Sequence, residues 1–347
     1  MSYKNENMKM IELHENGLDI RFRIRENGVV ELADFSSQEV KKAVMEPKED
    51  ICYPAVEIHR SGTGSLNMHA YKNNINQSSV DFVYENHELK EQDGGKELEI
   101  VMVSPEKLKA VYHMRLFDGV PAVQTWTEII NEGSEDQGLT YVSSFMYQGI
   151  SRGGEKPYYK KTDIYVPFNS WCCEAQWQKY DAETLNLNGM VVDGFNHQGY
   201  GLNRYCYSGK GTWSTCEYLP MGIAEDRETG ETYIFQIESS GQWLAEYGSA
   251  QGGNLYLALS GATEQEHGWY KNLKPGESFT TVPAGAAVVK GGLNPAAAAL
   301  TRYRRKVRRP NTDDEKLNVV FNDYMNCLMG DPTTERELSI IGSRAWM

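Results

Sequence analysis

Long apolar runs are missing from this sequence. No stretch approaches the about 18 consecutive apolar residues that a membrane-spanning helix needs. The first ten residues, MSYKNENMKM, also lack the apolar segment of a secretory signal peptide. We therefore expect a cytoplasmic protein that has no membrane partner.

Disulfide and metal-binding patterns are absent as well. The six cysteines, at 52, 172, 173, 206, 216 and 327, form no C-x-x-C pair, and the seven histidines show no H-E-x-x-H spacing. The segment SGTGSLN at 61–67 lacks the third glycine of a dinucleotide fingerprint. The sequence therefore predicts reduced thiols in the core of the protein, no metal site and no cofactor.

Basic residues are scarce relative to acidic ones. The chain has 35 lysines and arginines against 48 aspartates and glutamates, which gives a formal net charge of −13. A protein that binds nucleic acid needs a basic face, so we exclude nucleic acid as a partner. The one basic cluster, RYRRKVRRP at 302–310, is short, and we interpret it as one exposed face of a helix.

Helical periodicity is rare between residues 10 and 290, where strand patterns dominate. Segments such as LDIRFRI, SVDFVYENHEL and LKAVYHMRLF alternate in polarity, and turn signals such as QDGG and SGKG separate them. The segment RETGETYIFQIE has the form of a β-hairpin. With 40% apolar residues, 21 tyrosines and 32 glycines, the sequence predicts a mainly β protein with large antiparallel sheets around an aromatic core.

The pattern changes after residue 290. The segment 291–311 has high helix propensity, with Pro295 at a helix start and Pro310 at its end, so we expect a linker helix. Over 312–347, the apolar run in LNVVFNDY predicts a strand, NCLMGDP a loop, and TTEREL a capped helix. This order is typical of the opening unit of a parallel α/β fold.

Five ordered blocks carry a resemblance to a known family. They contain VPFNSWCCEAQWQKY, GTWSTCEYLPMGIAED, YIFQIESSGQWLAEYG, LYLALSGATEQEHGWYKNLKPGESFTTVPA and VVFNDYMNCLMGDPTTERE, at 166–180, 211–226, 233–248, 255–284 and 319–337. Together they resemble the bacterial α-galactosidases of glycoside hydrolase family 36, and the resemblance covers most of the chain.

The resemblance implies a galactose mutarotase-like β-supersandwich over 1–290, a linker helix over 291–311 and an incomplete (β/α)8 barrel that begins at 312–347. In this family two barrel aspartates on later strands hydrolyse terminal α-galactosides with retention. We therefore expect this chain to be the non-catalytic N-terminal part, inactive alone, of a homo-oligomeric parent enzyme. The last residues, SIIGSRAWM, depart from the family pattern, which suggests a truncation or a frame change.

The resemblance also implies sugar-binding residues. Asn322, Asp323 and Tyr324 occupy the segment whose aromatic residue lines the galactose pocket in the family, where many members have Trp in place of Tyr324. Asp331, although it flanks the same loop, is expected to cap a helix.

Two further groups are candidates for contact with α-galactosides. Trp171, Glu174 and Trp177 have a spacing that a turn could display together, facing either a sugar or another subunit. A structural packing cluster at a loop of the sandwich is the simpler interpretation. His69 and Lys72 lie in the polar segment NMHAYKNN, where a solvated loop is the simpler interpretation. By contrast, we expect Trp213 and Trp243 to be core residues.

Two other functions stay open. One is a stand-alone carbohydrate-binding module, which an aromatic-rich, acidic protein permits. The other is a mutarotase-like sugar epimerase, which needs a His and a Glu that converge on one sugar ring. His59, His69 and His113 are available, but no spacing singles out a pair.

Overall fold

The computed structural model divides the chain into two compact units, residues 1–306 and 307–347. The structure describes residues 9–40, 42–47, 52–64, 72–74, 76–188, 203–250, 253–316 and 319. His69 and the predicted barrel residues Asn322, Asp323, Tyr324 and Asp331 lie outside these ranges. The predicted strand–loop–helix unit therefore stays a prediction.

The first unit is mainly β, as its alternating pattern predicted. Its strands are β1 (Lys9–Glu15), β2 (Leu18–Ile24), β3 (Val30–Ser37), β4 (Ile58–Arg60), β5 (Val83–Gln92), β6 (Gly95–Val103), β7 (Leu108–Phe117), β8 (Val120–Asn131), β9 (Gln137–Ile150), β10 (Thr162–Ser170), β11 (Cys173–Asp181), β12 (Arg204–Gly209), β13 (Met221–Asp226), β14 (Glu231–Ile237), β15 (Trp243–Ala250), β16 (Asn254–Ser260), β17 (Lys271–Leu273), β18 (Ser278–Thr280) and β19 (Ala284–Lys290).

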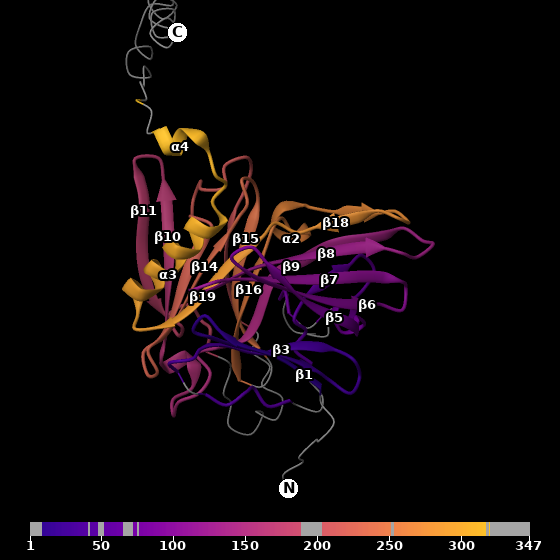
Figure 1. The fold of residues 1–347 in the computed structure, drawn as a ribbon, viewed down its shortest axis with the longest axis horizontal. Coiled ribbons are helices and arrows are strands. Elements are labelled where there is room, and N and C mark those ends of the chain that lie inside the picture. Colours follow the sequence, from indigo (N-terminus) through magenta and orange to yellow (C-terminus); the bar gives the residue numbers. More distant parts are fainter. Residues whose placement is uncertain are drawn as a thin grey trace, which may run out of the picture. The chain divides into compact units, whose positions relative to one another are not determined.

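These strands form three antiparallel sheets. One has the order β1-β2-β3. A ten-stranded sheet has the order β11-β10-β13-β14-β19-β8-β7-β6-β5, with β18 paired to β8. A six-stranded sheet has the order β12-β15-β16-β9-β17, with β4 paired to β9. This architecture confirms the predicted fold class of large antiparallel sheets (Figure 1).

Among the described residues, the helices are short apart from one. They are α1 (Gln77–Val80), the 3₁₀ turn η1 (Tyr158–Lys160), α2 (Glu264–His267) and α3 (Leu293–Val307) in and at the end of the first unit, and α4 (Thr312–Lys316) in the second. None of the helices in the described part of the chain combines the length and apolar character that a membrane span requires.

One apolar core joins the three sheets. It takes residues from every sheet, for example Phe22 of β2, Ile100 of β6 and Leu257 of β16. Large aromatic side chains fill much of it, including Tyr112 and Trp243, which are fully buried. These aromatic side chains therefore contribute mainly to packing in the core, as the composition predicted.

Strand β6 shows how alternation separates this core from the opposite face. Leu98, Ile100 and Met102 point into the core, whereas Glu97 and Glu99 alternate with them on the other side of the sheet. Because successive side chains on a strand point to opposite faces, Glu97 and Glu99 of β6 give the outer face of the ten-stranded sheet a polar region at this strand.

The hairpin predicted in RETGETYIFQIE is formed by β13 and β14. Glu225 pairs with Thr232, and Gly230 in the connecting turn has a φ of 74°. A positive φ is strained for residues with a Cβ, so the Thr-Gly signal located this turn correctly.

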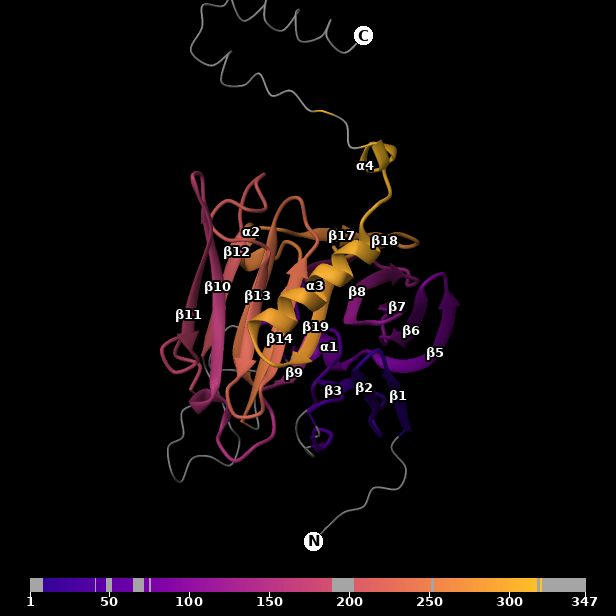
Figure 2. The same cartoon turned by 60° about the vertical axis from the view of Figure 1, so that its left-hand side comes forward.

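Helix α3 forms within the predicted segment 291–311 and lies along the outer face of the ten-stranded sheet (Figure 2). Its buried stripe consists of Ala296, Ala299, Leu300 and Tyr303, at helical spacing. Arginines on the opposite side are exposed, which confirms that the basic cluster includes an exposed helix face.

The prediction that the cysteines are core residues is wrong for those that the structure describes. Cys172, Cys173 and Cys216 are exposed, and Cys52 and Cys206 are half-buried; all five are free thiols. The exposed three belong to a turn and a loop that lie beyond the packed part of the strands. Residue type alone did not reveal this, because cysteine is on average a buried residue.

Candidate functional site

The turn between β10 and β11 projects a large apolar side chain. Trp171 in this turn is 82% exposed. Ser170 pairs with Cys173 across a two-residue connection, and Cys172 takes a φ of 60° to close it. A non-glycine residue at such a φ is uncommon and concentrates at turns and functional sites.

A bulge follows directly on the β11 side of this turn. Ala175 has a φ of 52°, and its backbone N–H donates to the Asn169 side-chain oxygen at 3.0 Å. The register of β10 and β11 shifts at this point. Bulges re-aim side chains at the ends of strands, and this one sets the direction of the turn that carries Trp171.

A second loop, residues 210–220 between β12 and β13, packs against the same turn. The Asn169 side chain donates to the Thr215 carbonyl at 2.5 Å, and its backbone N–H donates to the Glu217 carbonyl at 2.8 Å. Trp213 of this loop is 67% exposed, so its predicted core position is wrong. We call the turn 170–173 and the loop 210–220 together the tryptophan end.

A hollow of about 510 Å³ lies at the tryptophan end. Aromatic rings and polar groups share its lining, which comprises Phe168, Asn169, Ser170, Cys173, Gln176, Glu217 and Tyr218. Its volume falls in the range of small-molecule sites, about 300–1,000 Å³. Apolar rings beside amide and carboxylate groups suit a polyhydroxylated ligand, which offers both C–H faces and hydroxyl groups.

The structure separates the three residues expected to act together in this region. Trp171 is in the turn, and Glu174 is exposed, with its carboxylate accepting from the Cys172 N–H at 3.2 Å. Trp177, in contrast, faces Pro167 in the register and lines a different cavity of about 290 Å³ beside α3. The spacing in the sequence could not predict this separation, because the turn and the bulge change the directions in which the side chains point.

Lys72 does not belong to a solvated loop, contrary to that interpretation of its segment. It is 2% exposed, and its ammonium group donates to the carbonyl oxygen and hydroxyl of Ser249. Burial lowers the pKa of Lys72 to about 8, and the nearby Glu246 carboxylate partly opposes this shift. Lys72 is therefore a buried residue whose ammonium group is bound by Ser249.

Glu246 of β15 is the centre of a neighbouring buried hydrogen-bond network. Its carboxylate is fully buried and accepts from Arg204 at 2.8 Å, from the Asn73 backbone and side chain at 2.9 Å, and from the Tyr256 hydroxyl. Arg204 also contacts Glu266 at 3.0 Å. A buried carboxylate needs such partners, because an unpaired charge in the interior is costly.

Neither a family model nor a curated protein sequence matches this chain. Solved structures do match it. The family 36 α-galactosidase AgaB from Geobacillus stearothermophilus has a TM-score of 0.69 at 15% identity, over 93% of this chain and 46% of that one. The α-galactosidase from Lactobacillus brevis has a TM-score of 0.63 at 14% identity, over 88% of this chain and 42% of that one.

A third solved structure is a variant of the α-galactosidase AgaA from Geobacillus stearothermophilus in complex with stachyose. Its TM-score is 0.66 at 14% identity, over 89% of this chain and 44% of that one. This chain thus spans less than half the length of each of these enzymes. At such identities the likeness shows a shared fold: this chain has the sandwich architecture found in family 36 α-galactosidases.

Proposed function

We propose that this chain is the β-sandwich part of an α-galactosidase-like glycoside hydrolase, and that its tryptophan end helps to bind α-galactosides. The observation that carries this proposal is the fold likeness to AgaB, which extends over 93% of the chain. The complexes of AgaA variants with stachyose and raffinose indicate the class of sugar to test. Ring stacking on Trp171 or Trp213 would supply the apolar part of such binding.

We further propose that the chain does not cleave the glycosidic bond by itself. Retaining hydrolysis needs two carboxyl groups that flank the scissile bond, about 5–5.5 Å apart. The carboxylates of Glu97 and Glu99 do approach each other, but they stand side by side on β6 and both point at His113. They do not face each other across the hollow at the tryptophan end, which other residues line.

The test is hydrolysis of p-nitrophenyl α-galactoside by the purified chain, whose intact mass is verified first. We expect no turnover above the buffer rate. Turnover that Glu97→Gln and Glu99→Gln abolish would overturn the proposed non-catalytic role, because it would identify this pair as the reacting carboxyls. Turnover that survives in both variants would equally overturn it and would point to other carboxylates.

A second candidate function is sugar binding by this chain alone, and the exposure of two tryptophans favours it. Calorimetric titration with melibiose and raffinose measures this directly. We expect millimolar affinity that Trp171→Ala weakens, together with an unchanged melting temperature, because Trp171 is mostly exposed. Absence of heat at millimolar sugar would leave only the supporting role in the larger enzyme.

We propose, in addition, that the parent enzyme is a homo-oligomer and that the edge strand β11 takes part in its contacts. Most of the β11 side chains are exposed, and the strand stands at one end of the ten-stranded sheet. Unpaired edges with nearby large apolar groups are sites of association. Sedimentation of the wild type and of a Trp171→Ala, Trp213→Ala double variant checks this: an unchanged mass distribution contradicts a role in assembly.

The described candidate histidines, His59 and His113, give no geometric support to an epimerase function; His69 lies outside the described ranges. Ring opening of a sugar needs an acid and a base that both reach it. His113 Nδ1 lies only 2.9 Å from Glu97 Oε1, which leaves no room for a sugar between these two atoms. His59 is buried against Tyr141, with a ring-centroid separation of 4.8 Å.

A further inference from the structure

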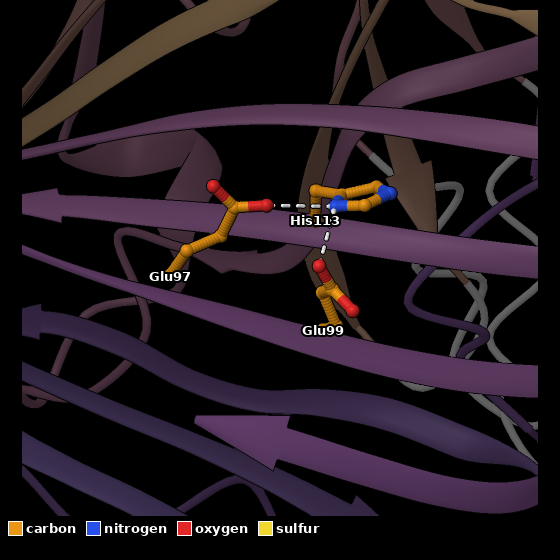
Figure 3. A group of neighbouring side chains, drawn as sticks. All are labelled: Glu97, Glu99 and His113. Carbon is orange, nitrogen blue, oxygen red and sulfur yellow. Dashed lines mark hydrogen bonds and ion pairs between the residues drawn. The ribbon is translucent and has the colours of Figure 1, made fainter. Parts of the chain in front are cut away.

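Three side chains of types that can bind a metal ion meet on the outer face of the ten-stranded sheet. Glu97 and Glu99 come from β6, and His113 comes from the neighbouring strand β7 (Figure 3). Glu99 and His113 stand directly opposite each other in the register, and Glu97 reaches the same imidazole from the next outward-facing position. This group lies apart from the tryptophan end and does not depend on the proposed function.

The ligand atoms of this group converge on one small volume. His113 Nδ1 lies 2.9 Å from Glu97 Oε1 and 3.8 Å from Glu99 Oε1, and one ligand atom from each residue lies within 4.8 Å of the others. Zinc binds N and O ligands at about 2.0–2.2 Å, so ligand atoms around a tetrahedral ion are about 3.3 Å apart. The two distances from His113 Nδ1 bracket this value, and the two carboxylate oxygens, which lie within 4.8 Å of each other, are the pair that would adjust around an ion.

Side chains of β5 hold the far oxygens of both carboxylates. Gln92 donates to Glu97 Oε2 at 2.7 Å, and the Lys90 ammonium lies 2.6 Å from Glu99 Oε2. In each carboxylate, Oε1 therefore remains directed at His113 Nδ1, where it could bind an ion. Such second contacts orient metal ligands and raise metal affinity.

The imidazole ring is held as well. His113 is stacked on Trp126 of β8, with ring centroids 4.7 Å apart and an interplanar angle of 8°. The stacking fixes the ring plane while Nδ1 points at the carboxylates. The three side chains are 10–22% exposed, so they are largely desolvated and yet open to an ion from solution.

The charge balance at this position favours a cation. Two carboxylates face one ammonium, that of Lys90, so the two carboxylates carry an excess negative charge over this partner. The guanidinium of Arg115, which stands opposite Glu97 in the register, lies instead over the Phe117 ring at 5.2 Å. The net charge of −13 further concentrates cations near the surface.

We propose that Glu97, Glu99 and His113 form a binding site for one divalent transition-metal ion of the zinc class. The imidazole Nδ1 and one oxygen from each carboxylate are its three protein ligands. One imidazole nitrogen with two carboxylate oxygens suits zinc, because imidazole is a preferred zinc ligand and carboxylates bind it at similar distances. Three protein ligands leave a fourth coordination position for water or for an oxygen of a bound molecule. This proposal departs from the expectation, drawn from spacing alone, that the chain has no metal site.

The test is calorimetric titration of tag-free, chelator-treated protein with zinc chloride. We expect one equivalent to bind, and at least tenfold weaker binding in His113→Gln, Glu97→Gln and Glu99→Gln, whose melting temperatures are measured alongside. The matched control is His14→Gln. His14 also contacts two carboxylates, but through different nitrogens, with Nδ1 at 2.7 Å from Asp19 and Nε2 at 3.4 Å from Glu12. It cannot bring both to one ion, so zinc binding remains unchanged.

Exposed thiols are the competing zinc ligands, and a second experiment separates them. Cobalt(II) bound by Glu97, Glu99 and His113 lacks the thiolate-to-cobalt charge-transfer absorption that cysteine ligands produce. We expect cobalt binding without this band, and unchanged zinc affinity in a Cys172→Ser, Cys173→Ser variant. The proposal would be overturned if the cysteine variant lost zinc binding or if His113→Gln kept it. Absence of zinc binding in the wild type would also overturn it.

Discussion

Tyr303 of α3 lies directly over Gly285 of β19. A Cβ at position 285 would stand 2.5 Å from the tyrosine ring, closer than real Cβ contacts come. The tyrosine hydroxyl donates to Glu238, and its ring meets Phe117 edge to face at 5.5 Å. The absence of a side chain at Gly285 is therefore the condition for this helix to dock on the sheet.

Gly285→Ala is expected to destabilise the protein by about 1–3 kcal/mol, because the added methyl group overpacks the contact with Tyr303. Urea denaturation measures the change in the free energy of unfolding. The control is Gly241→Ala, where an added Cβ meets nothing within 4 Å. Equal decreases in the free energy of unfolding of the two variants would show that the contact with Tyr303 does not cause the destabilisation.

The buried ammonium group of Lys72 predicts a pH dependence of stability. Its pKa in the folded protein is about 8, below the ordinary value of 10.5. Between these values the unfolded chain holds more protons at this group, so stability rises with pH. From pH 7.5 to 9.5 the wild type should gain about 2 kcal/mol relative to Lys72→Met.

Denaturant unfolding of both proteins across this pH range provides the measurement. The difference between them isolates Lys72 from the buried tyrosines, whose raised pKa values act in both proteins. A difference that stays constant with pH would contradict the buried, weakly basic state of this side chain.

The buried position of Glu246 predicts a large effect of its removal. Glu246→Gln should cost about 3 kcal/mol, because it removes the charge that compensates Arg204 in a desolvated network. Glu266→Gln is the matched control: it removes a carboxylate from the same Arg204 at the partly exposed end, and should cost below about 1 kcal/mol. Thermal and urea unfolding measure the stability of both variants. A larger loss of stability in Glu266→Gln would contradict the view that Glu246 is the main partner of Arg204.

The thiols should differ in reactivity. Burial raises the pKa of Cys206 to about 11, whereas Cys173 is exposed. Because the thiolate is the reactive form, alkylation of Cys206 at pH 8 should be about 100-fold slower than that of Cys173. Peptide mapping by mass spectrometry after timed labelling gives both rates. In urea the two rates should converge; comparable rates in the native protein would contradict this environment for Cys206.

The positions of the tryptophans could be predicted from the sequence only in part. The sequence indicates that Trp171, Glu174 and Trp177 could lie together, but Trp177 lines the cavity beside α3 whereas Trp171 stands in the exposed turn. A sugar-binding role of Trp171 stays a prediction. Trp213 was expected in the core and is exposed. Aromatic residues favour strands and cores on average, and nothing local distinguishes a tryptophan in a long connecting loop from one in a buried strand.

The sequence by itself determined the types of local structure. Alternating polarity, a Thr-Gly turn and an alanine-rich helix start are short-range signals, and β13, β14 and α3 formed where these signals predicted them. The tertiary structure alone decided which distant residues meet. Glu97, Glu99 and His113 become neighbours only through the register of β6 against β7, and a shift of one residue would send these side chains to opposite faces.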